Sequence, residues 1–512
     1  MLIKTFGGAV YGVNAAVITI EVNIIQGASF YLVGLPDNAV KESQFRIEST
    51  FKSNNFRMPG RRVIVNMAPA DLKKEGSAYD LPLAVGILAA SGQILCPDLE
   101  KYLIMGELSL DGGVKPIKGV LPIAIEARKN GYKGFILPMH NAREAAVVNN
   151  LDVIGVEHFN QAVDFLTGKL EIEPTVVDTR NEFISNINDY EVDFFDVKGQ
   201  ENVKRALEIA AAGGHNLLMI GPPGAGKTML AKRIPTILPP LSLNEALETT
   251  KIHSVAGKMG RDASLMTCRP FRSPHHTISD VALVGGGSYP QPGEISLAHN
   301  GVLFLDELPE FKRSVLEVMR QPLEDRNITI SRSKFSIEYP ASFMLVASMN
   351  PCPCGFYNHP EKDCVCSSGV VQKYLNRISG PLLDRIDIHI EVVPVPFDKL
   401  SELRPSESSE NVRYRVIKAR KIQIDRFNDH EGIHCNAQLT PALMREHCNI
   451  SDEGNQLLKN AMEKIGLSAR AYDRILKVSR TIADLDDSID ILPHHLAEAI
   501  NYRSLDRESW AG

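Results

Sequence analysis

The sequence predicts an α/β protein with a helical carboxy-terminal part, and three observations lead to this prediction. A short apolar strand at 217–220 runs directly into a glycine-rich loop and then into a helical stretch at 229–234. Two further apolar strands, at 301–305 and 343–350, end in polar side chains. From about residue 396 onward, strand patterns give way to helical patterns with interleaved charges.

Residues 1 to about 170 also alternate strands with helices. The stretches 17–22 and 30–33 have the composition of strands. The stretch 81–91 is typical of a buried helix, and 121–130 of an amphipathic one. Residues 1–20 carry no cleavage-site pattern, so we interpret them as a first strand pair rather than a signal peptide.

The bulk composition is that of an ordinary globular protein. The chain has 512 residues, of which 44% are hydrophobic and 23% charged, and this length suggests about three domains. Because the net charge is −6, any nucleic-acid contact needs a local basic patch. No stretch reaches the ~18 uninterrupted apolar residues of a membrane helix, so we expect a cytoplasmic protein without a membrane partner.

Composition shifts divide the chain into four segments. We expect an N-terminal domain, an acidic irregular linker, a central α/β domain and a helical lid domain, over residues 1–170, 171–193, 194–395 and 396–512. In the last segment, helical patterns cover 457–465, 471–483 and 493–502.

The glycine-rich loop has the GxxxxGK[ST] pattern of a phosphate-binding loop. Its residues are Gly221, Pro222, Pro223, Gly224, Ala225, Gly226, Lys227 and Thr228. Glycines let backbone N–H groups turn toward phosphate oxygens, and the following helix adds the positive end of its dipole. Lys227 is placed to reach the β- and γ-phosphates of ATP, and Thr228 to hold Mg²⁺. A glycine-rich turn with no ligand is the alternative, and it leaves the strand–loop–helix context unexplained.

The two later strands add acidic and amide groups. Asp306 and Glu307 follow the strand 301–305, about 80 residues after the loop. We expect Asp306 to support Mg²⁺ and Glu307 to polarise the attacking water. Asn350 ends the third strand and is expected to orient that water or contact the γ-phosphate. The alternatives are an ordinary exposed acidic pair and a turn asparagine before Pro351.

These elements together resemble the Walker A, Walker B and sensor 1 motifs of AAA+ ATPases. The segment 376–387 resembles the one that presents an arginine finger to a neighbouring subunit, with Arg385 as first candidate and Arg377 as second. The segment 468–474 resembles sensor 2, with Arg470 as the γ-phosphate arginine. An arginine that acts on a neighbour implies a ring, for AAA+ proteins usually a hexamer. For each arginine the alternative is a solvated surface ion pair.

The segments 269–279 and 285–300 strongly resemble the magnesium-chelatase-like AAA+ proteins, most closely the family of the bacterial competence protein ComM, also called YifB. The resemblance covers essentially the whole chain. It implies an insert in helix 2 and a hairpin before sensor 1, which face the pore and grip DNA in related ring motors. It further implies a homo-hexameric helicase that couples ATP hydrolysis to movement on single-stranded or branched DNA. Such a helicase would promote branch migration in recombination or natural transformation. Recombination proteins are then candidate partners. The alternative is a chelatase-type motor that remodels a partner protein.

Two basic stretches are candidates for DNA contact. The first comprises Lys251, Lys258, Arg261, Arg269, Arg272, His275 and His276. The second flanks the expected hairpin at 328–331 and 335–338 and comprises Arg326, Arg332 and Lys334. Cations on pore loops would bind phosphates without sequence preference. The alternative is that they are solvated charges or contacts between subunits.

Four of the eight cysteines crowd into a 15-residue loop, 352–366, as two CxC pairs. They are Cys352, Cys354, Cys364 and Cys366. Four thiolates at this spacing favour a structural Zn²⁺ in a closed tetrahedral site. His359 could replace one ligand, and a redox pair or an Fe–S cluster is the alternative to zinc.

The N-terminal domain resembles the Lon protease domain in two stretches, 73–84 and 106–119. That family uses a Ser–Lys dyad, in which the lysine activates the serine. Alignment on these stretches places Ala78 at the nucleophile position and Leu121 at the lysine position, with Ser77 and Lys118 close by. We therefore expect a Lon-protease-like α+β domain that is not proteolytic and serves ring assembly or DNA binding. An ATP-dependent protease is the disfavoured third function.

Overall fold

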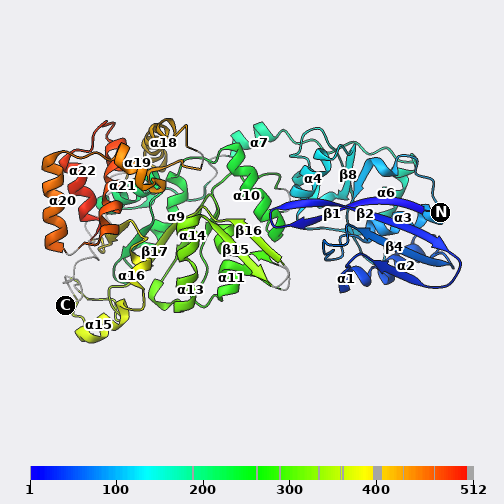
Figure 1. The fold of residues 1–512 in the computed structure, drawn as a ribbon, viewed down its shortest axis with the longest axis horizontal. Helices are drawn as coiled ribbons and strands as arrows, with labels where there is room; N and C mark the ends of the chain where they lie inside the picture. Colours follow the sequence, from blue (N-terminus) through cyan, green and yellow to red (C-terminus); the bar gives the residue numbers. More distant parts are fainter. Residues whose placement is uncertain are drawn as a thin grey trace. The chain divides into compact units, whose positions relative to one another are not determined.

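A computed structural model gives the fold drawn in Figure 1. It describes residues 2–186, 190–260, 263–287, 290–332, 335–357, 359, 362–395, 406–430, 432–465 and 467–503. Arg261, Lys334 and the stretches 396–405 and 504–512 lie outside the described residues. The chain forms two compact units. The first unit comprises Met1–Asn186, Leu243–Thr267 and Pro290–Pro292, and the second unit comprises Ile187–Ser242, Cys268–Tyr289 and Gly293–Gly512.

A seven-stranded mixed sheet is the scaffold of the first unit. Its spatial order is β3-β4-β2-β1-β5-β8-β9. The strands are β1 (Leu2–Tyr11), β2 (Asn14–Ile25), β3 (Phe30–Val33), β4 (Arg62–Ala68), β5 (Tyr102–Ile104), β8 (Gly134–Pro138) and β9 (Asp152–Val156), with a separate small pair β6 (Glu107–Leu108) and β7 (Val114–Lys115). Strands β1 and β2 pair antiparallel along their whole length, which confirms the expected first strand pair.

Helices complete the first unit. They are α1 (Asn38–Lys41), α2 (Ser43–Ser53), α3 (Asp80–Ala90), α4 (Val120–Lys129), α5 (Ala142–Ala145), α6 (Phe159–Leu166), α7 (Thr179–Asn186) and α10 (Leu243–Ala256). Gly86 of α3 packs on Thr5, and Ile123 of α4 packs on Gly8. Because residues 5 and 8 of one strand face opposite sides, α3 and α4 cover opposite faces. Every residue of α3 is buried, as its apolar composition predicts.

The stretch 171–193, expected to be irregular, contains helix α7. The helix starts at Asp178, whose carboxylate accepts the backbone N–H of Asn181 at 3.1 Å. Glu182 is held by Arg143 and by the hydroxyl of Ser264. Local charge patterning missed this helix because its partners come from distant parts of the chain.

A five-stranded parallel sheet is the scaffold of the second unit. Its order is β11-β14-β17-β10-β18. The strands are β10 (Leu217–Ile220), β11 (Phe271–Arg272), β14 (Val302–Leu305), β17 (Met344–Met349) and β18 (Ile388–Glu391). Strand β17 therefore lies between β10 and β14, and the carboxyl ends of all three meet at one edge.

Short helices and hairpins surround this sheet. The helices are α8 (Glu201–Gly213), α9 (Lys227–Ile237), α11 (Asp280–Val284), α12 (Glu294–Leu297), α13 (Arg313–Val318), α14 (Arg320–Asp325), α15 (Ser368–Leu375) and α16 (Gly380–Leu383). Strand β12 (Gly285–Gly286) is two residues long, and β13 (Gln291–Pro292), of the same length, belongs to the first unit. Strands β15 (Asn327–Arg332) and β16 (Phe335–Pro340) pair antiparallel, which confirms the expected hairpin.

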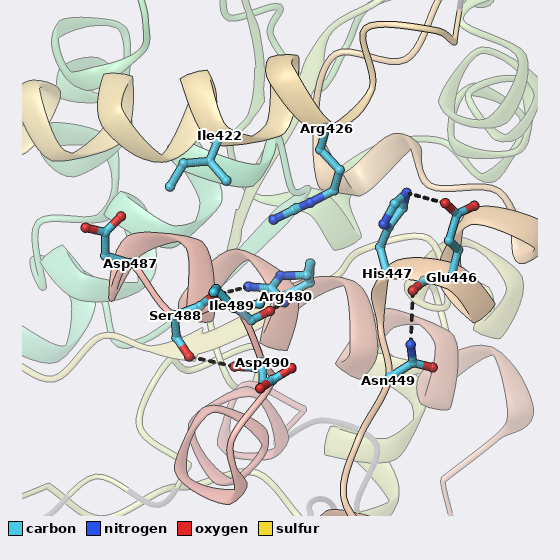
Figure 2. A pocket seen from close by; sticks show the side chains of 10 residues that line it. All are labelled: Ile422, Arg426, Glu446, His447, Asn449, Arg480, Asp487, Ser488, Ile489 and Asp490. Atoms are coloured by element: carbon cyan, nitrogen blue, oxygen red, sulfur yellow. Dashed lines mark hydrogen bonds and ion pairs between the residues drawn. The ribbon is translucent and has the colours of Figure 1, made fainter.

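The carboxy-terminal helices belong to the second unit. They are α18 (Ser409–Arg426), α19 (Pro441–His447), α20 (Asp452–Ile465), α21 (Ala469–Leu485) and α22 (Pro493–Asn501), and they confirm the helical prediction. A hollow of about 400 Å³ lies among them. Figure 2 shows the side chains that line it, among them Arg426 of α18 and Arg480 of α21. Both guanidinium groups pair with the buried carboxylate of Asp484 in α21, Arg426 from the neighbouring helix α18 and Arg480 from the same helix.

Helix α10 belongs to a different part of the molecule than its position in the sequence suggests. Its position in the chain assigns it to the segment 194–395, whereas in the structure it belongs to the first unit and contacts α4. None of the described helices is both long enough and apolar enough to cross a bilayer.

Candidate nucleotide site

The loop between β10 and α9 has a backbone path that needs glycine. Gly224 and Gly226 have φ values of 80° and 90°, the left-handed region in which a side chain is strained. At Gly221, an added β-carbon would lie 2.2 Å from the carbonyl oxygen of Val392. The predicted glycines are therefore required by the turn and by close packing.

Lys227 begins α9 and is buried beneath this loop. Its ammonium donates to the carbonyl oxygens of Gly221 and Pro222 at 2.6 and 3.0 Å, and to Oδ1 of Asn350 at 3.1 Å. Burial lowers the pKa of Lys227, and the nearby carboxylates oppose that shift. No side chain caps the start of α9, which leaves its first N–H groups available to an anion.

The ends of β14 and β17 bring oxygen atoms to the start of α9. Asp306 accepts the hydroxyl of Thr228 on Oδ2 at 2.8 Å, and it accepts the hydroxyl of Ser348 on its other oxygen. Carboxylate and hydroxyl oxygens are the hard ligands that Mg²⁺ prefers. Ser348 was not predicted. The signal that could have found it is its place two residues before Asn350, on the same face of one strand.

Glu307 follows Asp306 in the left-handed region, with φ of 55°. Such strain in a residue with a side chain costs of order 1–3 kcal/mol and is common at functional sites. Its carboxylate is 54% exposed and lies 3.5 Å from Nδ1 of His276. The local sequence does not indicate this contact, because His276 and Glu307 are 31 positions apart.

A cavity of about 340 Å³ collects these groups. Its lining comprises Pro223, Gly224, Ala225, Gly226, Lys227, Thr228, Met229, Asp306, Glu307, Ser348, Met349 and Asn350. The loop is further held by Gln200, whose amide donates to the carbonyl oxygens of Ala225 at 2.9 Å and Val393 at 3.1 Å. The structure thus brings together the predicted loop, both acidic residues and the predicted amide.

The two candidate finger arginines lie outside this cavity and differ in exposure. The side chain of Arg385 is 10% exposed and forms a 2.5 Å ion pair with Glu324. The side chain of Arg377 is 52% exposed and lies 2.8 Å from Glu310. A finger that reaches a neighbouring subunit needs an exposed guanidinium, so the geometry favours Arg377 over the first candidate.

The predicted sensor 2 arginine also lies outside the cavity lining. Arg470 is 61% exposed and forms a 3.3 Å ion pair with Asp384. Arg474, one turn further along α21, lies 3.1 Å from the buried carboxylate of Asp387. Arg474 is therefore paired with a buried carboxylate, whereas the ion pair of Arg470 is the more exposed of the two.

The four clustered cysteines meet as the CxC spacing predicts. The Sγ atoms of Cys352, Cys354 and Cys364 are 3.3–3.6 Å apart, and all four Sγ atoms lie within 4.8 Å of one another. A tetrahedral zinc with Zn–S bonds of about 2.3 Å would space them by about 3.8 Å, so this set fits a metal. His359 is outside the cluster, and its Nδ1 accepts the backbone N–H of Lys362 at 3.1 Å.

The cysteine loop packs against the phosphate-binding loop. Gly355 has φ of 85°, and a β-carbon added there would lie 2.5 Å from Cδ of Pro223. Asn350 stands two residues before Cys352, which is fully buried. The cysteine cluster is therefore tied to both sides of the cavity.

The positions equivalent to a Ser–Lys dyad carry no dyad. Ala78 contributes only its carbonyl oxygen, which accepts the N–H of Gly106 at 2.7 Å. The hydroxyl of Ser77 donates to the carboxylate of Glu107. Leu121 offers a backbone N–H and an apolar side chain, so no lysine replaces the missing base at that position.

A parallel sheet with this strand order, this loop and these carboxylates defines an ATPase of the P-loop, AAA+ class. Family profiles agree: "Magnesium chelatase, subunit ChlI" matches residues 193–400, "Subunit ChlI of Mg-chelatase" matches 20–141, and the C-terminal ChlI profile matches 406–503. The chain therefore belongs to the magnesium-chelatase-like AAA+ family, in the branch that contains YifB and ComM.

Two near full-length relatives support this membership, and a third protein is similar over a shorter stretch. YifB of Escherichia coli K12 is 45% identical over 504 residues, which cover 98% of this chain and 96% of that protein. Competence protein ComM of Haemophilus influenzae is 44% identical over 504 residues, 98% of this chain and 97% of that protein. Lon protease 2 of Bacillus subtilis is 31% identical over 159 residues, 28% of this chain and 27% of that protein.

Proposed function

We propose that the chain is a motor in which ATP·Mg²⁺ is hydrolysed between the loop 221–228 and the ends of β14 and β17. Lys227 binds the β- and γ-phosphates, and Thr228 and Asp306 hold Mg²⁺, which neutralises charge on the phosphates. Glu307 polarises the attacking water, and Asn350 orients it. The cavity that gathers these side chains is the observation that carries the proposal.

The Lys227 contacts suggest how ATP enters. Its ammonium donates to two carbonyl oxygens of the loop and to Asn350. Phosphate oxygens offer a charged acceptor in place of these neutral ones, and charge-assisted hydrogen bonds are roughly twice as strong. ATP binding therefore releases the amide of Asn350 for the water and the γ-phosphate.

We propose that the motor is a homo-hexamer. Charge on the transferred phosphoryl group needs a cation beyond Lys227, and no arginine lines the cavity of a single chain among the described residues. Arg377, exposed and close to Glu310, is suited to supply it to a neighbour. In a ring each such contact repeats and closes on itself.

We further propose that the substrate is DNA, single-stranded or branched, and that the motor promotes branch migration. The near full-length likeness to a protein named for competence supports this step. Two of the basic residues expected to contact DNA have other contacts, however. Arg272 pairs with Glu294 at 2.6 Å, and Arg269 donates to the carbonyl oxygens of Pro239 and Asn300, so both have structural roles. The hairpin β15–β16 is then the better candidate for DNA contact.

An assay with branched DNA tests this proposal. Purified protein receives ATP, Mg²⁺ and a labelled four-way junction, and strand products are separated on a gel. We expect dissociation of the junction by the wild-type chain and none by Lys227→Ala. An intact junction with an active ATPase would exclude the DNA motor.

A chelatase-type remodelling ATPase is the second candidate, because three family profiles carry that description. Its hydrolysis would respond to a partner protein and not to DNA. The near full-length likeness to a competence protein favours the DNA motor. We also propose that the cluster binds a structural Zn²⁺, and that the N-terminal domain is not proteolytic.

A further inference from the structure

Helix α10 links the two units covalently. It begins at Leu243, and only residues 238–242 separate it from α9, the helix that Lys227 starts. After α10 the chain returns to the second unit at Cys268. Although α10 interrupts the nucleotide-binding part of the sequence, its packing belongs to the first unit.

A small buried cluster joins α10 to the start of α4. Ser254, near the end of α10, is 2% exposed, and its hydroxyl donates to Oε1 of Glu144. Its carbonyl oxygen accepts the N–H of Gly119 at 3.0 Å. The N–H of Leu121 donates to Oε1 of Glu144 at 3.1 Å, with Oγ of Ser254 at 3.4 Å.

This cluster has little tolerance for a lost partner. Glu144 is 5% exposed, and burial raises its pKa, while hydrogen bonds from Ser254, Leu121 and Asn141 oppose that shift. A buried carboxyl group that loses a donor is costly, so the contact is made or broken as a unit. Beyond Ser254, a β-carbon added at Gly257 would lie 2.8 Å from Cε of Lys118, so the chain passes close to α4 there too.

We propose that α10 transmits the nucleotide state of the second unit to the first unit, with the Ser254–Glu144 contact as its anchor. The inference rests on the proposed ATPase function. When phosphates replace the loop carbonyl oxygens around Lys227, the start of α9 shifts. The link 238–242 carries this displacement to α10 because it is stiff: it contains Pro239 and Pro240, whose carbonyl oxygens accept from Arg269 at 2.6 and 3.3 Å. Helix α10 then moves relative to α4, and the hydrogen bonds to Gly119 and Leu121 lengthen.

In this anchor, the position that corresponds to the lysine of the Lon Ser–Lys dyad has a different role. Leu121 contributes its backbone N–H to the anchor, and Glu144 caps the start of α4 through that group. A helix of the nucleotide-binding segment thus docks where the resemblance would place the catalytic base of a protease. In this proposal, the first unit changes its hydrogen bonds around α4 when ATP binds to the second unit.

Hydrogen exchange on the full chain tests this proposal. Amide exchange is followed by mass spectrometry with and without a slowly hydrolysed ATP analogue and Mg²⁺, over peptides covering 221–228 and 117–123. In the wild type we expect protection at 221–228 and a change of about threefold or more in the exchange rate at 117–123. Ser254→Ala should keep the protection at 221–228 and lose the change at 117–123. Its affinity for the analogue should stay within about twofold of the wild-type value.

Two further variants sharpen the result. Glu144→Gln keeps an oxygen that accepts from Ser254 and Leu121 and loses only the long 3.4 Å hydrogen bond from Asn141, so it should still show the change at 117–123. Asn244→Ala alters an exposed residue of α10 away from the anchor and should also respond normally.

The outcomes separate the two proposals. Protection at 221–228 without any change at 117–123 in the wild type would overturn the transmission role alone. A wild-type response in Ser254→Ala would overturn the anchor. Absence of protection at 221–228 would contradict the nucleotide site itself, and the inference with it.

Discussion

Lys227 is the residue on which the proposed nucleotide binding depends most. It supplies a buried ammonium beneath the loop, and no other lysine or arginine lines the cavity among the described residues. We predict that Lys227→Ala lowers ATP hydrolysis by at least about 100-fold, because the β- and γ-phosphates lose their cation. Lys232→Ala, on the exposed face of the same helix, is the matched control and should hydrolyse ATP normally. Phosphate release measures both, and near-normal turnover by Lys227→Ala would contradict the assignment.

We predict opposite effects on turnover and stability for substitutions of the two candidate finger arginines. Arg377→Ala should keep its melting temperature and its ATP affinity but lose about 100-fold or more in turnover, because it acts on the neighbour's transition state. Arg385→Ala should lower the melting temperature, because it removes a mostly buried side chain that pairs with Glu324. Calorimetry and steady-state kinetics on both variants separate these effects. A stable, inactive Arg385→Ala with a normal Arg377→Ala would restore the first candidate.

Among the elements, the cysteine loop couples most directly to the nucleotide cavity. We predict about one zinc per chain by elemental analysis. Cys352→Ser should lose the metal and weaken ATP binding, because Gly355 would no longer be held against Pro223. Cys96→Ser, a free cysteine of the first unit, serves as the control. Metal-free wild-type protein with full ATP affinity would show that the loop does not support the site.

The sequence predicted the elements whose signals are local. The phosphate-binding loop, the strands that end in Asp306 and Asn350, and the hairpin all depend on short patterns of residue type, and the structure has them. Features set by long-range packing were not predictable. The burial of Arg385 depends on Glu324, some 60 positions away. The docking of α10 depends on Glu144, more than 100 positions away.

At the scale of the whole molecule, the proposed ring would complete the site by bringing a neighbour's arginine to it. We predict that Glu307→Gln, which binds ATP without hydrolysing it, forms hexamers when ATP and Mg²⁺ are present. Native mass spectrometry gives the subunit number directly. The double variant Glu307→Gln with Lys227→Ala should assemble poorly, because nucleotide at the subunit contact is missing. Monomers of Glu307→Gln under saturating ATP would exclude the trans-acting arginine.

The rate of phosphate release from ATP·Mg²⁺, with and without branched DNA, tests the central claim most directly. We predict Mg²⁺-dependent hydrolysis by the wild-type chain, stimulation by branched DNA, and a loss of about 100-fold or more in Glu307→Gln. If the wild-type rate equals that of Glu307→Gln, both with DNA and without it, the chain is not an ATPase that uses this site.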